Sequence, residues 1–329
     1  MKIGILGCTG AVGQQMMRVL EERKLDIEEL RLFASERSVG KTFEFNGKII
    51  EVENMTNKNF DGLDYVLGAL EADLSKEIAQ VVVDAGAVYI DNSSAFRMNE
   101  NVPLVVPEVN PEDCFKHSGI IANPNCSTII SMVAMNGINK CSKIEKIIAS
   151  TYQAVSGAGV KGMQELNAQI RALAQGQVVL PEVFTKQIAY NCIPQIGSYD
   201  KNGYTSEEMK MQNEGRKILH NDKLLVNCTC VRVPVIRSHS ISITCITEEK
   251  VELEQIKKSL QETKGIVLEN EPTPLEVSNQ DLVYVGRLRN DLVFENGISL
   301  WCVGDQIRKG AATNAIQIIE VLESGIQTD

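Results

Sequence analysis

One cysteine lies where a thiol can act as a nucleophile. Cys126 follows Asn123-Pro124-Asn125, ends an apolar stretch and opens a segment with helical spacing. A thiol in the first turn of a helix lies near the positive end of the helix dipole, which favours the reactive thiolate at neutral pH. Most cysteines are simply small buried side chains, so its place at a predicted helix start makes Cys126 the candidate nucleophile.

A nucleophilic thiol needs an acid/base partner, and the chain holds 3 histidines. His117 falls in a polar loop, and His220 follows a predicted helix, where it can interact with the helix carboxyl end. His239 lies in a strand-rich segment beside Arg232 and Arg237, and its imidazole is suited to acid/base catalysis. Spacing alone leaves the choice open.

Three glycines near the start suggest a dinucleotide site. Gly7, Gly10 and Gly13 stand between a predicted strand over residues 2–6 and a predicted helix over residues 14–22. Such glycines let the backbone turn sharply and approach a pyrophosphate, whose charge lies against the helix amino end. The alternative is a purely structural turn.

The residues after the second predicted strand, 30–33, bear on the choice of cofactor. Glu36 could accept a hydrogen bond from the ribose 2′-hydroxyl of NAD. Its neighbours instead supply several donors, which suit the 2′-phosphate of NADP better. These donors are Ser35, Arg37, Ser38 and Lys41.

Predicted elements place these groups in two domains. Strands at 65–67 and 89–90 and a helix at 74–78 continue the alternation of the first 40 residues, which is typical of a doubly wound parallel sheet. After about residue 125, runs rich in β-branched residues and a polar helix-prone stretch predict a larger mixed sheet with helices on one face. These runs are 147–152, 223–235 and 238–246, with the helix at 205–219.

We therefore predict an α/β protein with two domains. Residues 1–125, rejoined by a C-terminal helix over 309–329, form a Rossmann domain, and residues 126–308 form an α+β domain.

Composition excludes several classes of function. The 329-residue chain has a net charge of −10, which argues against binding to nucleic acid or anionic membranes. No apolar run approaches the roughly 18 residues of a membrane span, and the start has no signal-peptide core. The 9 cysteines lack paired metal-ligand spacing, so we expect reduced thiols, no metal site and a cytoplasmic protein.

Many short segments, in the same order, resemble the bacterial aspartate-β-semialdehyde dehydrogenase family over essentially the whole chain, although residues 68–73 are more similar to its archaeal and fungal branch. The matching segments are residues 7–13, 35–38, 92–98, 106–110, 123–128, 151–159, 207–210, 232–240 and 308–312.

The resemblance implies NADPH-dependent reductive dephosphorylation of L-aspartyl 4-phosphate to aspartate semialdehyde and phosphate. This step serves lysine, methionine, threonine and diaminopimelate biosynthesis. Cys126 would carry a thioacyl intermediate, His239 would be the acid/base catalyst, and Gln153 would orient the intermediate. The second domain would be catalytic and would form a homodimer.

The resemblance also assigns the binding residues. Arg232 would clamp the substrate α-carboxylate and Glu207 would lie near its α-amino group, with phosphate contacts from Arg97, Asn125 and Lys210. Without the resemblance, Glu207 and Lys210 are an ordinary i,i+3 surface ion pair. The NADP contacts would be Gly7, Thr9, Gly10, Ala11, Val12, Gly13, Ser35, Arg37, Ser38, Ser156, Gly157 and Gln306, with Gln306 at the nicotinamide amide.

Two other functions share part of this residue pattern. N-acetylglutamyl-phosphate reductases share the fold and chemistry, but that family carries glycine where this chain has Asn125. A non-catalytic NADP-binding redox sensor would use Cys126 as its responsive thiol. Such a sensor needs no substrate clamp, so the presence of Gln153, Arg232 and His239 together argues against it.

Overall fold

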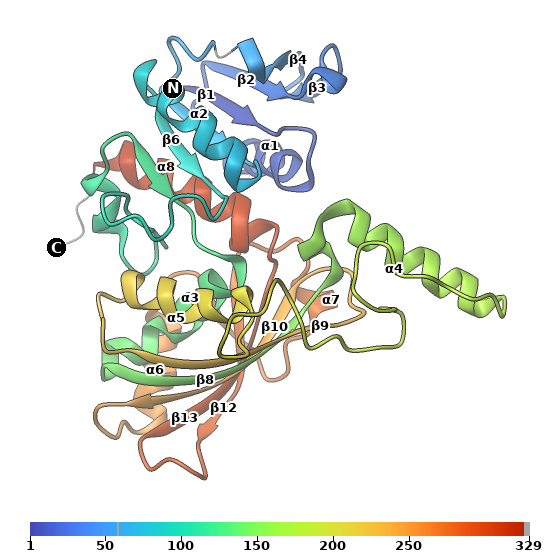
Figure 1. The fold of residues 1–329 in the computed structure, drawn as a ribbon. Coiled ribbons are helices and arrows are strands. Elements are labelled where there is room, and N and C mark those ends of the chain that lie inside the picture. Colours follow the sequence, from blue (N-terminus) through green and yellow to red (C-terminus); the bar gives the residue numbers. More distant parts are fainter. Residues whose placement is uncertain (58, 326–329) are drawn as a thin grey trace. The chain divides into compact units, whose positions relative to one another are not determined.

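The computed structural model describes residues 1–57 and 59–325 (Figure 1). The chain divides into two compact units. The first comprises Met1–Asn125 and Ala311–Asp329, and the second comprises Cys126–Gly310. No helix within the described ranges combines the length and apolar character that a bilayer-spanning segment requires.

The first unit is built on a seven-stranded sheet with the strand order β3-β4-β2-β1-β5-β6-β7. The central strands are buried along most of their length, as expected for parallel strands covered on both faces. Its strands are β1 (Lys2–Leu6), β2 (Glu29–Ala34), β3 (Thr42–Phe45), β4 (Lys48–Asn54), β5 (Tyr65–Gly68), β6 (Val88–Asp91) and β7 (Ile120–Ala122).

Helices pack on both faces of this sheet, which confirms the predicted doubly wound fold. On one face, α1 (Ala11–Arg23) and α8 (Thr313–Ser324) share a core that includes Met16 and Ile319. On the other, α2 (Ala72–Asp84) contributes Ile78 and Val82 to a second core. The C-terminal helix α8 thus completes the first unit.

One edge departs from the predicted all-parallel sheet, because β3 pairs antiparallel with β4. The two strands are joined by Asn46 and Gly47, whose φ angles are 48° and 75°. An Asn-Gly pair with two positive φ angles is the favoured two-residue hairpin turn.

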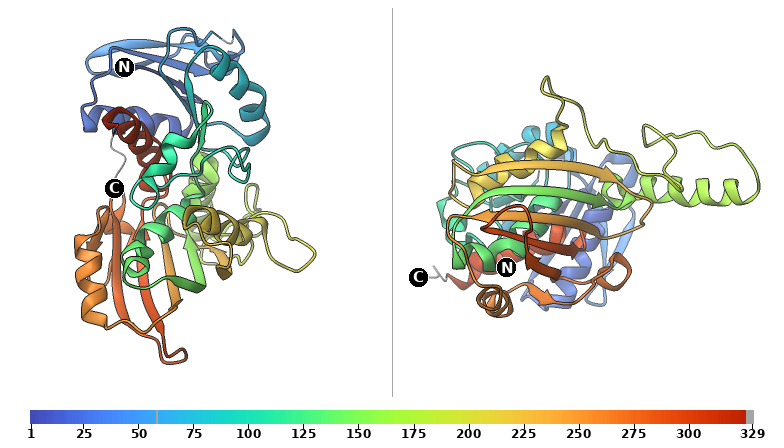
Figure 2. Two further views of the ribbon diagram at one scale, coloured as in Figure 1. Left: turned by 90° about the vertical axis from the view of Figure 1, so that its left-hand side faces the viewer. Right: turned by 90° about the horizontal axis from the view of Figure 1, so that it is seen from below.

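The second unit holds a mixed sheet, as predicted. The sheet has six strands in the order β11-β12-β13-β10-β8-β9. Helices α3, α5 and α6 cover one face of this sheet (Figure 2). The side chains of Ile148 and Tyr152 on β8 are exposed. The strands are β8 (Ile144–Gln153), β9 (Leu225–Arg232), β10 (His239–Thr247), β11 (Ile266–Leu268), β12 (Val283–Asn290) and β13 (Gly297–Gly304). The helices are α3 (Cys126–Cys141), α4 (Gly159–Ala174), α5 (Ser206–Ile218), α6 (Leu253–Glu262) and α7 (Pro274–Val277).

An arm that the sequence analysis did not anticipate projects from this unit (Figure 1). It consists of α4 and a return segment, residues 175–188, that contains no helix or strand. Two buried side chains on α4 hold the returning backbone. The Glu165 carboxylate accepts from the N–H groups of Glu182 and Val183, and Gln169 Oε1 accepts from the N–H groups of residues 188 and 189.

Candidate active site

Cys126 is the first residue of α3, as predicted, and its side chain is partly exposed. Gly310 packs directly against it. A Cβ atom added to Gly310 would lie 2.9 Å from Cys126 Cβ and 3.3 Å from Cys126 Cα. Any side chain at position 310 would therefore displace the thiol.

His239 begins β10 and is completely buried. Its Nδ1 accepts a hydrogen bond of 3.0 Å from the backbone N–H of Ala154. The neutral ring must therefore carry its proton on Nε2. Burial, reinforced by the positive charge of Arg232, lowers the pKa of His239 to about 3, so the imidazole is neutral at pH 7.

Gln153, at the end of β8, links His239 to the polar side chains around it. Its Oε1 accepts from the Thr151 hydroxyl at 3.0 Å, and its Nε2 donates to Glu207 Oε1 at 3.1 Å. These contacts fix the amide orientation. Gln153 Nε2 lies 3.4 Å from His239 Nε2, but an amide nitrogen does not accept a hydrogen bond. Gln153 therefore does not accept the Nε2 proton of His239.

Glu207 joins this group from the first turn of α5. The helix begins with a capping box, in which Thr205 and Glu208 satisfy each other's backbone N–H groups. Glu207 Oε2 accepts from Lys210 Nζ at 2.8 Å, so the i,i+3 ion pair exists. It is not an ordinary surface pair, because Glu207 is buried and also binds Gln153.

Arg232 is buried at the end of β9, where it pairs in register with Gln153. Its Nη1 donates to the Ala154 carbonyl at 2.7 Å, and its Cζ lies 5.9 Å from the centre of the Phe184 ring. Burial lowers the pKa of Arg232, while the negative charges of Glu207 and Cys126 oppose this shift. A cavity of about 170 Å³ opens beside Arg232 and Phe184, so a small anion has access to the guanidinium.

Three predicted cofactor contacts also lie in this unit. Gln306 Nε2 donates to the Ser156 hydroxyl, and Gln306 Oε1 accepts from the Ser238 N–H at 2.8 Å. Gln306 and Ser156 are therefore bonded to each other. Gly157 is exposed, and a Cβ atom added there would lie 2.7 Å from Arg232 Nη1 and 3.3 Å from His239 Cε1.

The position of Gly157 gives a test of whether it borders the substrate or the cofactor. We expect Gly157→Ala to raise the KM for the semialdehyde by about 10-fold, because the methyl group crowds Arg232 and overpacking costs ~1–3 kcal/mol. The KM for NADP should stay within about twofold. Steady-state kinetics with each substrate varied in turn measures both, and a rise confined to NADP would contradict the substrate-side placement.

In the first unit, the turn between β1 and α1 has the form of an anion-binding cradle. Gly7 has a φ of +76°, and a Cβ atom on Gly13 would lie 2.4 Å from the Gly7 carbonyl oxygen. Gly10 caps α1 without a side-chain hydrogen bond, and Thr9, Ala11 and Val12 complete the turn. The backbone leaves no room for a side chain at Gly7 or Gly13, and the helix start presents N–H groups that favour a pyrophosphate.

The donors predicted for the 2′-phosphate follow β2, as expected. Ser35 precedes a short 3₁₀ turn, Glu36–Ser38, and the Ser38 N–H donates to the Ser35 carbonyl at 2.8 Å. Arg37 is exposed, and within residues 1–57 and 59–325 its guanidinium has no ion-pair partner. A phosphate can therefore bind the Arg37 guanidinium without first displacing a carboxylate from it.

We expect Arg37→Ala to raise the KM for NADP by about 10- to 100-fold, because a hydrogen bond to a charged group is worth ~1.5–3 kcal/mol. The KM for NAD should change little, since NAD lacks the 2′-phosphate. Coenzyme-dependent kinetics measures both, with Glu36→Ala as the matched neighbour. Equal effects on the two coenzymes would rule out this role for Arg37.

Arg97 and Asn125, predicted to bind phosphate, also belong to the first unit. Arg97 is buried, and it donates through Nε to the Asn123 carbonyl at 3.0 Å and through Nη2 to the Asn92 carbonyl at 2.8 Å. Asn125 is buried at the end of this unit, immediately before Cys126 in the chain.

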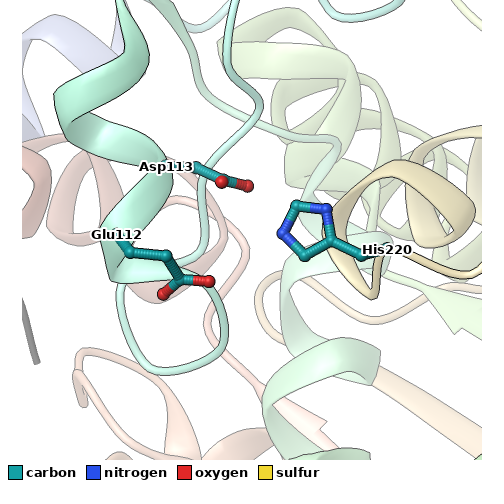
Figure 3. A group of neighbouring side chains, drawn as sticks. All are labelled: Glu112, Asp113 and His220. Carbon is teal, nitrogen blue, oxygen red and sulfur yellow. The ribbon is translucent and has the colours of Figure 1, made fainter. Parts of the chain in front are cut away.

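Three further side chains are of metal-ligating types, namely Glu112, Asp113 and His220 (Figure 3). Asp113 is already an ion-pair partner, since its Oδ1 accepts from Lys116 Nζ at 2.6 Å. The two carboxylates belong to the first unit and His220 to the second, so we assign no metal site to them.

Sequence reasoning missed three groups that hold the predicted residues in place. The Ala154 N–H orients His239, Phe184 packs against Arg232, and the buried Asp305 bonds to the segment before His239. Only Asp305 had a local signal, because a carboxylate directly after an apolar strand is unusual.

Comparisons with known proteins match both units. The family model for the semialdehyde dehydrogenase NAD binding domain matches residues 2–117, and the model for the semialdehyde dehydrogenase dimerisation domain matches residues 135–309. The aspartate-semialdehyde dehydrogenase of Aquifex aeolicus is 47% identical, with 98% of this chain and 97% of that protein covered. The Bacillus subtilis enzyme of the same name is 43% identical, with 98% and 97% covered.

Solved structures agree with these matches. Aspartate semialdehyde dehydrogenase II from Vibrio cholerae, complexed with ASA, has a TM-score of 0.97 at 45% identity, with 98% of each chain covered. The Candida albicans aspartate semialdehyde dehydrogenase with NADP has a TM-score of 0.76 at 25% identity, again with 98% of each chain covered.

Proposed function

Because the chain belongs to the aspartate-semialdehyde dehydrogenase family, we propose that it reduces L-aspartyl 4-phosphate to L-aspartate 4-semialdehyde, with NADPH as reductant and release of phosphate. The observation that carries the proposal is the group formed by Gln153, Glu207, Arg232 and His239 in the unit that begins with Cys126. A nucleophile, a hydrogen-bond donor for the reacting oxygen and a carboxylate clamp are the parts that this reaction needs.

The glycine turn and its neighbours fit the coenzyme. The cradle formed by Gly7, Gly10 and Gly13 would hold the pyrophosphate, and Ser35 and Arg37 would hold the 2′-phosphate. When bound, NADPH supplies the hydride. Gln306 would reach the nicotinamide amide only after exchanging its bonds to Ser156 and Ser238.

The chain's own residues account for the other bonds made and broken. The Cys126 thiolate attacks the acyl carbon, so a C–S bond forms and the C–O bond to phosphate breaks. As hydride reaches the thioester carbon, the Nε2–H of His239 donates a hydrogen bond to the oxygen that becomes negatively charged. When this oxygen reforms the C=O bond, the C–S bond breaks, which releases the aldehyde and restores the thiolate without a net proton transfer.

The charged side chains would orient the substrate. Arg232, with its planar guanidinium, would bind the α-carboxylate, and Glu207 would bind the α-ammonium group. Lys210, Arg97 and Asn125 would bind the phosphate. Glu207 accepts hydrogen bonds from both Gln153 and Lys210. The residue that would bind the amine is therefore linked to the residue that would bind phosphate and to the one that would orient the intermediate.

We also propose that the protein is a cytoplasmic homodimer. The second unit matches the dimerisation-domain model, and its sheet exposes Ile148 and Tyr152, which a second copy would cover. All nine cysteines are free thiols, a state that the reducing cytoplasm maintains.

The direct test is NADPH formation, followed at 340 nm, from aspartate semialdehyde, phosphate and NADP. We expect turnover that requires phosphate and is faster with NADP than with NAD. Turnover only with N-acetylglutamate semialdehyde would favour the related reductase. Binding of NADP without turnover of either aldehyde would favour the redox sensor.

A further inference from the structure

Asp305 is a buried carboxylate that the reaction above does not use. It follows β13 directly, its side chain is completely buried, and it lies in the second unit with Cys126 and His239. A buried charge is costly unless it is paired and hydrogen-bonded, so the partners of Asp305 show what the fold gains from it.

Four donors converge on this carboxylate. Oδ2 accepts from Arg237 Nε at 2.6 Å and from the Asn279 N–H at 2.7 Å. Oδ1 accepts from the N–H groups of Ile307 at 2.9 Å and Arg308 at 3.1 Å. One side chain therefore joins three segments that are distant in sequence, around residues 237, 279 and 307.

The first of these segments leads directly to the imidazole. Arg237 is two residues before His239, and between them Ser238 is buried with a φ of +71°, an uncommon conformation for a non-glycine residue. The Ser238 N–H donates to Gln306 Oε1. The Ser238 hydroxyl is hydrogen-bonded to the Ser278 hydroxyl at 2.9 Å. Gln306 is next to Asp305 in the chain, and Ser278 is next to Asn279, whose N–H donates to Asp305.

The third segment leads to the thiol. The backbone carbonyl of Asp305 accepts from the Gly310 N–H at 3.0 Å, and Gly310 is the residue that packs against Cys126. The side chain of Asp305 fixes the start of this turn through Ile307 and Arg308, and its carbonyl fixes the end.

We propose that Asp305 is a positioning residue that sets the placement of the Cys126 thiol relative to the His239 imidazole. This inference deepens the proposed function and rests on it. Asp305 acts through Arg237 and Ser238 on one side and through Gly310 on the other, and it touches neither catalytic group. Removing its charge pairing is expected to slow the chemical steps and to leave coenzyme binding intact.

The first variant is Asp305→Asn. Its amide keeps one acceptor oxygen, but its NH₂ group would face two of the four donors. We expect kcat to fall by about 10- to 100-fold, since a misplacement of about 1 Å in a catalytic group has this effect. The KM for NADP should stay within about twofold. The rate of Cys126 alkylation by iodoacetamide, followed without substrates by mass spectrometry of the peptide that carries Cys126, should change by at least about threefold.

The matched control lies at the other end of the β12–β13 hairpin. Asp291 also accepts from two backbone N–H groups, those of Val293 and Phe294, and from the Ser299 hydroxyl. Asp291→Asn should lower the melting temperature and leave kcat and the alkylation rate within about twofold of wild type. An Asp305→Asn protein with unchanged kcat and alkylation rate would overturn the proposal, as would an equal loss of kcat in Asp291→Asn.

A second variant keeps the test decisive if Asp305→Asn does not fold. Arg237→Gln leaves Asp305 with its three backbone donors and removes the ion pair that joins it to the segment before His239. We expect a kcat loss of about 3- to 10-fold, and an unchanged kcat would count against the proposal. The alkylation rate tests the positioning role of Asp305 without any substrate. Turnover by the wild-type protein tests the proposed reaction, so failure of one proposal can be told apart from failure of the other.

Discussion

Replacement of Cys126 by serine is expected to lower kcat by about 10⁴-fold or more, the scale seen when a covalent nucleophile is removed. A serine hydroxyl remains protonated at neutral pH, so the attacking thiolate is lost while the start of α3 is retained. The measurement is turnover at 340 nm, with NADP binding used to verify that the first unit is intact.

The same helix provides the control. Cys141 is the last residue of α3 and, like Cys126, is partly exposed. Cys141→Ser should retain wild-type kcat. With aspartate semialdehyde and NADP but no phosphate, intact mass should show an acyl group on the wild-type and Cys141→Ser proteins only. An acyl adduct on Cys126→Ser, or substantial turnover by it, would place the nucleophile elsewhere.

The second large effect is expected at His239. His239→Asn removes the Nε2–H and should lower kcat by about 10²- to 10³-fold, the usual cost of losing a hydrogen-bond donor to a developing oxyanion. The KM for NADP should hardly change. His117→Asn, in the first unit, is the control, and it should keep full kcat. A His239→Asn variant with near-normal kcat would remove the histidine from the mechanism.

His239 also makes a prediction about stability. Burial, followed by the charge of Arg232, lowers its pKa in the folded chain to about 3, against about 6.5 when unfolded. The unfolded chain therefore binds more protons between these values, and stability falls as the pH drops from about 6.5 toward 3. Thermal unfolding at a series of pH values should show this slope in the wild type, and it should be shallower in His239→Asn. Parallel slopes would contradict the burial of a neutral imidazole.

Features with local sequence signals could be predicted. The glycine turn, the start of α3 at Cys126 and the alternation of strands and helices depend on neighbours within a few residues. The β3–β4 hairpin had such a signal as well, because Asn46-Gly47 is a typical hairpin turn. The prediction of a uniformly parallel sheet in the first domain missed this antiparallel hairpin.

Other features depend on residues far apart in the chain. The i,i+3 spacing of Glu207 and Lys210 predicts their ion pair, but nothing near them reveals that Gln153 binds the same carboxylate. Asp305 and Arg237 are 68 residues apart, and their pairing follows from the β10–β13 register, in which His239 faces Gly304. The arm was missed because Glu165 and Gln169 hold its return segment by side-chain bonds to the backbone, which no periodic pattern records.

The return segment of the arm has an evolutionary consequence. Residues 175–188 include Phe184, which packs against Arg232, yet they contain no strand and add no hydrogen bond to the central sheet. Insertions and substitutions are tolerated best in such surface segments. Relatives can therefore diverge in the surroundings of the carboxylate clamp while the strands that carry Gln153, Arg232 and His239 stay constant, which separates the evolution of substrate preference from that of the chemistry.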